Sequence, residues 1–282
     1  MFLPLLPLLQ MTTEANVSFW SWSADPGVAF GVSAAAWYYF RRAGGRPDDG
    51  IEPISRARRI SFAGGLAMIV LALMSPIGVL ADNYLLSFHM LQHVMLTIIA
   101  PVLILLGIPA WMYEPVVRAF GGKLWRVWRV LTLPVIAFVL FHLPYSVYHV
   151  PAVYDLSLQY LPVHIAAHTF LLLVAMISWW SVLAPSPALG KVAPAVAILY
   201  LFVQTIPGQI VGAMITYADH VLYPSYQEAP RVFGLSAMND QQIGGLIMWV
   251  GTSTIYLAAV AIVFFRWASR EDRAHRQHYA GA

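Results

Sequence analysis

The sequence of 282 residues contains no cysteine, and only 10% of its residues are charged. Without cysteine, the chain can form no disulfide, no thiolate metal site and no cysteine nucleophile. Soluble domains average about 25% charged residues, so the low charge and the 60% content of hydrophobic residues exclude an ordinary soluble domain. Any metal must be held by histidine, methionine, carboxylate or backbone groups.

Apolar runs of nearly transmembrane length recur along the chain, and a helix needs roughly 20 apolar residues to cross a membrane. We predict an all-α integral membrane protein, in which residues 1–282 form a single polytopic domain, a bundle of seven transmembrane helices. The predicted spans are about 26–40, 60–80, 87–111, 131–143, 161–183, 192–217 and 241–267. Pro207 predicts a kink in the sixth span.

The first residues, 1–11, are apolar but contain two prolines and no basic segment. This composition fits a signal peptide poorly. We interpret the stretch as a leader that lies on the membrane surface or is disordered.

Lysine and arginine gather in alternate connections between the predicted spans. They follow the first, third, fifth and seventh spans, and Arg231 is the exception. Cytoplasmic loops carry an excess of these residues. The pattern therefore predicts an N-terminus outside and a cytoplasmic C-terminus.

Of the nine histidines, all but His275 and His278 fall near the predicted outer ends of the third to sixth spans. These histidines are His89, His93, His142, His149, His164, His168 and His220. The third and fifth spans each carry a pair four residues apart, and both spans run inward, so the pairs should lie at the same depth. Residues at this spacing share a helix face, with Cβ atoms about 6 Å apart. Because ionisable groups inside a membrane are costly and usually functional, we predict a metal site.

Imidazole ligands suit copper, zinc, iron and nickel, and methionine sulfur favours Cu(I). Met90 lies beside the first pair, so copper is the predicted ion. Carboxylates such as Asp240 can orient ligand imidazoles from outside the site. Asp240 also stands where the N-cap of the seventh span would lie, and we favour that interpretation.

Four separated stretches carry a resemblance to a known family: FHMLQHVMLTIIAPVLILLGIP, HLPYSVYHVPAVYD, LPVHIAAHTFLLLVAMISWW, and LYPSY followed by NDQQIGGLIMWV. From about Phe88 to Val250 the chain resembles the CtaG-type assembly factors of bacterial caa3-type cytochrome c oxidase. The resemblance implies a seven-helix inner-membrane protein needed to mature heme-copper oxidases, for which copper delivery is the usual proposed role. It carries over to the six histidines from His89 to His168, Tyr223 with Tyr226, Asp240 with Gln241, and Met248 with Trp249.

The leading hypothesis is a copper-binding assembly factor without enzymatic turnover in the bacterial inner (cytoplasmic) membrane. Copper would be captured at the periplasmic face by the two histidine pairs, with His149 or His220 completing or exchanging ligands and His142 nearby. Met90, Asp240 and Tyr223 are the expected outer partners of the ligands. The expected binding partners are heme-copper oxidase subunits, periplasmic copper chaperones and membrane lipid, but no nucleic acid; the oligomeric state is open.

Two other functions remain as alternatives. In a heme-binding membrane redox protein, His93 and His168 would ligate the iron axially. A copper transporter would need a ligand path through the inner half of the membrane as well. That half offers scattered methionines such as Met68, Met112 and Met176, which packing explains better.

Overall fold

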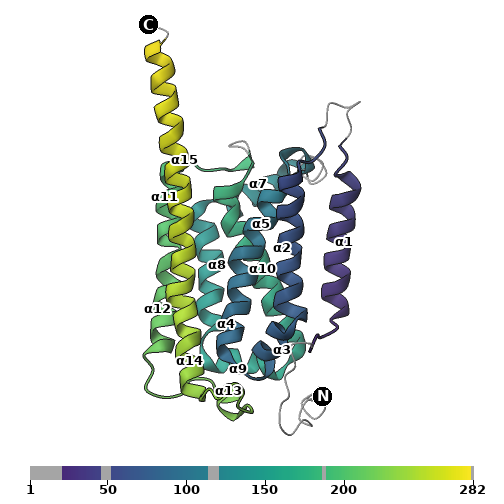
Figure 1. Ribbon diagram of the computed structural model, residues 1–282, viewed down its shortest axis with the longest axis vertical. Helices are drawn as coiled ribbons and strands as arrows, with labels where there is room; N and C mark the ends of the chain where they lie inside the picture. Colours follow the sequence, from purple (N-terminus) through teal and green to yellow (C-terminus); the bar gives the residue numbers. More distant parts are fainter. Residues whose placement is uncertain (1–20, 46–51, 114–120, 186–188, 281–282) are drawn as a thin grey trace.

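The computed structural model describes residues 21–45, 52–113, 121–185 and 189–280, and this part of the chain is helical and contains no strand (Figure 1). The long helices run side by side in one bundle, and the end of the last helix projects beyond it (Figure 1). The all-α prediction is confirmed. The predicted leader over residues 1–11 lies outside the described residues.

Five helical stretches are long and apolar enough to cross a membrane: Arg56–Met74, Leu86–Gly107, Leu161–Leu183, Pro194–Thr216 and Ala237–Gln277. A sixth span results if α7 (Gly121–Leu131) and α8 (Pro134–Tyr148), which meet at a bend of 68°, count as one. The first helix, α1 (Pro26–Arg42), has 17 residues and is shorter than these spans. The protein is thus a multi-pass helical membrane protein, and the count of seven spans stays a prediction.

The long stretches are built from smaller elements. α2 is Arg56–Met74 and α10 is Leu161–Leu183. α4 (Leu86–Val94), η3 (Met95–Ile99) and α5 (Ala100–Gly107) follow one another without a break, as do α14 (Ala237–Leu246), η5 (Ile247–Gly251) and α15 (Thr252–Ala280). η3 and η5 are π-helical, and such segments occur often at functional sites.

Proline explains where several helices start or break. It stands in the first turn of α8, α10 and α11 (Pro194–Val203), where a backbone N–H would have no hydrogen-bond partner within the helix. Between α11 and α12 (Thr205–Thr216) the sixth predicted span is interrupted at Gln204. Pro207 cannot donate to the carbonyl of Val203, and this agrees with the predicted kink.

The helix that contains the predicted fourth span continues beyond residue 143. Pro144 follows directly, yet it lies inside α8, which continues to Tyr148. A proline is tolerated within a membrane helix because neighbouring groups can satisfy the freed carbonyl. His142 therefore lies within the helix rather than at its end.

Three short helices lie together at one end of the bundle: α3 (Pro76–Asn83), α9 (Pro151–Gln159) and α13 (Pro224–Glu228) (Figure 1). The starts of α1 and α14 lie at the same end, and the far end of α15 lies opposite (Figure 1). We call this end the lid end. The other end carries the termini of α1, α2 and α15 that bear the arginines, among them Arg42, Arg58 and Arg270.

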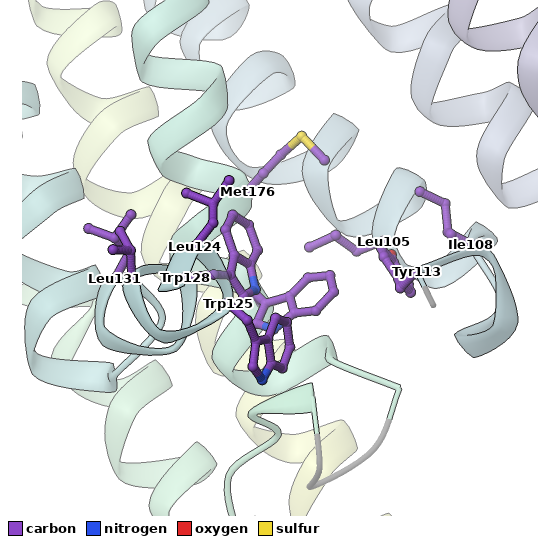
Figure 2. A pocket seen from close by; sticks show the side chains of 10 residues that line it. Leu105, Ile108, Tyr113, Leu124, Trp125, Trp128, Leu131 and Met176 are labelled. Atoms are coloured by element: carbon purple, nitrogen blue, oxygen red, sulfur yellow. The ribbon is translucent and has the colours of Figure 1, made fainter. Parts of the chain in front are cut away.

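An apolar pocket of about 460 Å³ lies toward the arginine-bearing end (Figure 2). Side chains from α5, α7 and α10 line it, including Leu105, Trp128 and Trp180. No histidine or carboxylate lines this pocket. Met176 is the one lining residue of a type that binds copper, and the histidines of the candidate site lie elsewhere.

Candidate metal centre

The two predicted histidine pairs face each other across α4 and α10. The ring of His168 lies 5.4 Å from the ring of His89 and 5.4 Å from that of His93, measured between centroids. His164 lies one turn before His168, with ring centroids 4.3 Å apart. All four side chains are buried. The four imidazoles therefore lie close together, and their binding of a metal stays a prediction.

Three of them meet closely enough to share one ion. Ring nitrogens of His89, His93 and His168 all lie within 4.8 Å of one another. The Nε2 atoms of His89 and His93 are 2.9 Å apart. With metal–nitrogen distances of about 2.0–2.1 Å, two ligand nitrogens of one ion lie about 3–3.5 Å apart. The spacing therefore fits a single metal ion with small adjustments of the rings.

The same three rings carry nitrogens without a protein partner. Nδ1 of His89, Nδ1 of His93 and Nε2 of His168 are buried and accept or donate no hydrogen bond. Leaving a buried polar atom unpaired costs about 1–3 kcal/mol. The three rings therefore lie in a buried site that the protein's own hydrogen bonds leave incomplete.

His149 stands beside this trio as a further candidate ligand. Its ring lies 5.3 Å from that of His93. Its Nδ1 lies 2.7 Å from the carbonyl oxygen of Tyr145 and must donate to it, which leaves the lone pair on Nε2. That Nε2 is buried and has no partner. A carbonyl that fixes one ring nitrogen and frees the other is the usual outer support of a histidine ligand.

Tyr223 supports His149 rather than contacting an ion. Its hydroxyl donates to the carbonyl oxygen of His149 at 2.9 Å. Burial raises the pKa of Tyr223 above its usual range, so the phenol stays neutral and keeps its proton for this bond. The predicted role of Tyr223 as an outer partner of a metal ligand stays a prediction.

Tyr154, which the sequence analysis did not single out, covers the trio from the lid end. Its ring from α9 lies 4.9 Å from the ring of His89. The hydroxyl of Tyr226 donates to the carbonyl oxygen of Ala81, so the hydroxyl of Tyr154, 2.8 Å away, donates to Tyr226. Burial raises the pKa of both phenols well above the usual range. The stretch YHVPAVYD could have pointed to Tyr154, because it places a tyrosine in the helix that directly follows His149.

Asp240 does not cap its own helix, so that interpretation was wrong. Ser236 is the N-cap of α14 and accepts from the backbone N–H of Asn239. Asp240 accepts instead from the backbone N–H groups of Leu86 at 2.7 Å and Ser87 at 3.1 Å, and from the Ser87 hydroxyl. The N-cap of α4 is Leu85, whose side chain cannot accept a hydrogen bond. Asp240 thus holds the start of the helix that carries His89.

His142, His220 and Met90 have other contacts in the structure. The Nε2 of His142 donates to the side-chain oxygen of Gln204, in a polar chain that continues to Ser178. The side chain of His220 is 73% exposed and pairs with Asp219. Met90 is buried against α14, where its Cγ lies next to Gly244. Among the described residues, neither His142 nor His220 belongs to the group of histidines that could share one ion.

His164 forms the outer edge of the cluster. Its Nε2 lies 3.3 Å from a carboxylate oxygen of Asp82 in α3. Its Nδ1 is buried without a partner. Asp82 therefore connects the buried rings with the surface of the lid end.

The fold and these contacts define a multi-pass helical membrane protein with a candidate metal centre made of histidine. The sequence profile of the cytochrome c oxidase caa3 assembly factor family matches residues 33–270, and the chain belongs to this family. The predicted resemblance is confirmed.

Curated relatives extend beyond the length of this chain. An uncharacterized protein of Mycobacterium bovis and one of Mycobacterium tuberculosis are each 29% identical over 97% of the chain, which spans 44% of their length. An uncharacterized protein of Mycobacterium leprae is 27% identical over 66% of the chain and 30% of its own length. The chain thus spans less than half the length of these relatives. No solved structure matches it.

Proposed function

We propose that this member of an oxidase assembly family binds copper at the buried histidine cluster and holds it for delivery to a heme-copper oxidase. The observation that supports the proposal is the convergence of ring nitrogens from His89, His93 and His168 within 4.8 Å. The family has a role in assembling cytochrome c oxidase. In this role the protein binds and passes on an ion, and no turnover is required.

The chemistry of the donors favours Cu(I). The trio consists of neutral imidazoles and includes no carboxylate. Burying charge in an apolar interior is costly unless it is compensated, so a monovalent ion suits a neutral site better than a divalent one. Imidazole binds copper well, and the absence of thiolate from the chain leaves the ion less tightly held than in a cysteine site. A weaker hold suits an ion that must be released.

The proposed setting is the bacterial inner membrane, with the lid end facing the periplasm. The arginines at the opposite end agree with a cytoplasmic side there. Oxidase subunits would receive the ion, and periplasmic copper chaperones would supply it.

The test compares copper content in protein purified in detergent from copper-supplemented cells. We expect about one copper per wild-type chain and loss of most of it in the double variant His93→Ala with His168→Ala. His220→Ala is the matched control, because that side chain is exposed and separate from the trio. Oxidase activity in membranes of the same strains should fall with the double variant and persist with the control.

Two further measurements are needed to interpret the copper content. Thermal melting and size-exclusion profiles establish that the double variant is folded. Wild-type protein without copper, or a folded double variant that retains it, overturns the proposal. A Soret absorption band in the wild-type protein would support the heme-binding alternative instead.

A further inference from the structure

We propose that Asp82 and His164 form an outer cation site, through which copper passes between the lid end and the trio of His89, His93 and His168. The inference rests on the proposed function and adds a path to it. The path uses a carboxylate from α3 and a histidine from α10.

Exposure falls in steps along this path. The side chain of Asp82 is 39% exposed and that of His164 is 10% exposed. His168, His93 and His89 are 5%, 2% and 0% exposed. An ion that arrives from water therefore meets the carboxylate first and the deepest imidazoles last.

The steps are short enough for the ion to exchange one ligand at a time. The carboxylate oxygen of Asp82 lies 3.3 Å from Nε2 of His164. The rings of His164 and His168 are 4.3 Å apart, and those of His168 and His89 are 5.4 Å apart, between centroids. Nδ1 of His164 is buried without a partner, so this ring has a free nitrogen as well as the one facing Asp82. His164 can therefore hold the ion before His168 replaces the carboxylate.

The two sites differ in charge and therefore in their effect on the ion. The trio contains no carboxylate and so supplies no negative charge that would attract a cation over a distance. Asp82 supplies a negative charge at the surface, and such a charge raises the local concentration of cations and their rate of arrival. Asp82 then governs how fast the ion enters and leaves, while the trio governs how tightly it is held.

The lid fixes the segment that carries Asp82. The carbonyl oxygen of Ala81, the preceding residue, accepts from the hydroxyl of Tyr226, which also accepts from Tyr154. The ring of Tyr154 lies against His89. The charge of Asp82 adds to the effect of burial in raising the pKa of Tyr226, which places the carboxylate close to this network. The outer site and the trio are thus held by the same tyrosines.

The experiment measures rates as well as content. Copper-free protein in detergent receives Cu(I) under reducing conditions, and a colorimetric Cu(I) chelator follows uptake and, in excess, release. We expect Asp82→Asn to slow both uptake and release by about tenfold, with copper per chain unchanged. Asp219→Asn is the matched control, because that carboxylate is exposed at the same end but pairs with His220. Its rates should equal those of the wild type.

Salt separates an electrostatic role from a structural one. Raising the ionic strength should slow uptake by the wild type and the control but have little effect on Asp82→Asn, because salt screens exposed charge. If Asp82→Asn takes up and releases copper at wild-type rates, this inference alone is overturned. It is also overturned if Asp82→Asn loses its copper while melting like the wild type. A wild-type protein that takes up no copper overturns the proposed function, and this inference with it.

Discussion

Six buried histidines share one feature at the scale of single residues: each keeps a ring nitrogen without a hydrogen-bond partner. An unpaired nitrogen alone does not identify a ligand, because His142 has one and lies apart from the trio. What distinguishes His89, His93 and His168 is that each has a ring nitrogen within 4.8 Å of a ring nitrogen of the other two. Proximity therefore selects the candidate ligands.

Asp240 should contribute to stability through the start of α4. Its buried carboxylate accepts from Leu86 and Ser87, so Asp240→Asn places an amide against N–H groups and leaves at least one unpaired. We expect a loss of about 1–3 kcal/mol, seen as a lower melting temperature in detergent. Because His89 lies in the first turn of α4, which these bonds hold, copper content should fall too.

Ser236→Ala is the control for that experiment. It removes the N-cap of α14 and should cost about 1 kcal/mol, while copper content stays unchanged because α14 carries no ligand of the trio. Equal melting temperatures for Asp240→Asn and the wild type would contradict the cap on α4.

The ligand pairs could be predicted from sequence because four-residue spacing on a helix is local. Contacts of Tyr154 and Asp82 could not, because they depend on how α9 and α3 fold over the end of the bundle. The position of His142 within its helix could not be predicted either, because α8 continues through Pro144 to Tyr148. Asp240 was assigned to its own helix because a capping pattern does not show that another helix begins beside it.

At the scale of elements, glycines bring helix backbones into contact near the site. A Cβ built on Gly245 in α14 would lie 2.3 Å from the hydroxyl of Thr216 and 2.7 Å from its backbone nitrogen. A Cβ on Gly212 in α12 would lie 2.7 Å from the backbone nitrogen of Trp249. Small residues allow such close approach between membrane helices. The pair α12–α14 is therefore sensitive to a single methyl group.

Gly245→Ala should weaken that helix pair. The added methyl meets backbone atoms, which cannot move aside as a flexible side chain can, so we expect a loss of about 1–3 kcal/mol. Gly31→Ala is the control, because a Cβ there meets nothing within 4 Å. Thermal melts in detergent should show a lower transition for Gly245→Ala only. A reversed order would show that α12 and α14 are not in close contact.

The π-helical segments show what a helical pattern leaves out. The five residues of η3 begin just after His93, in a stretch whose apolar sequence fits an uninterrupted helix. The hydroxyl of Thr97 donates to the carbonyl oxygen of His93, and the indole of Trp179 in α10 donates to that of Thr97. A carbonyl of the π-helical segment thus bonds to a residue 82 positions away. The spans could be predicted from hydrophobicity. The π-helical segment within one of them could not.

At the scale of the whole molecule, charge and chemistry separate to opposite ends. The histidine trio lies toward the lid end, and most arginines of the described helices lie at the other (Figure 1). At that end, Arg58 donates to the carbonyl oxygens of Leu106 and Ile108 at the end of α5. These arginines therefore have a structural role in addition to the topological one that the sequence indicates.

Because the natural chain has no cysteine, single introduced cysteines can report which end faces outward. Asp219→Cys lies at the lid end, and Ser269→Cys lies in the exposed last part of α15. A membrane-impermeant maleimide applied to intact spheroplasts should label Asp219→Cys and leave Ser269→Cys unlabelled until the membrane is permeabilised. The reverse pattern would invert the predicted orientation and move the copper site to the cytoplasmic side.

Ala24→Cys extends the same experiment to the number of spans. Ala24 is exposed and precedes α1, which falls short of the usual span length. If α1 crosses the membrane, six spans separate Ala24 from Asp219, and both cysteines should react in intact spheroplasts. A reaction of Ala24→Cys only after permeabilisation would mean that α1 does not cross. Six spans would then remain, and Ala24 and the basic connection after α1 would both lie on the cytoplasmic side, as the C-terminus does.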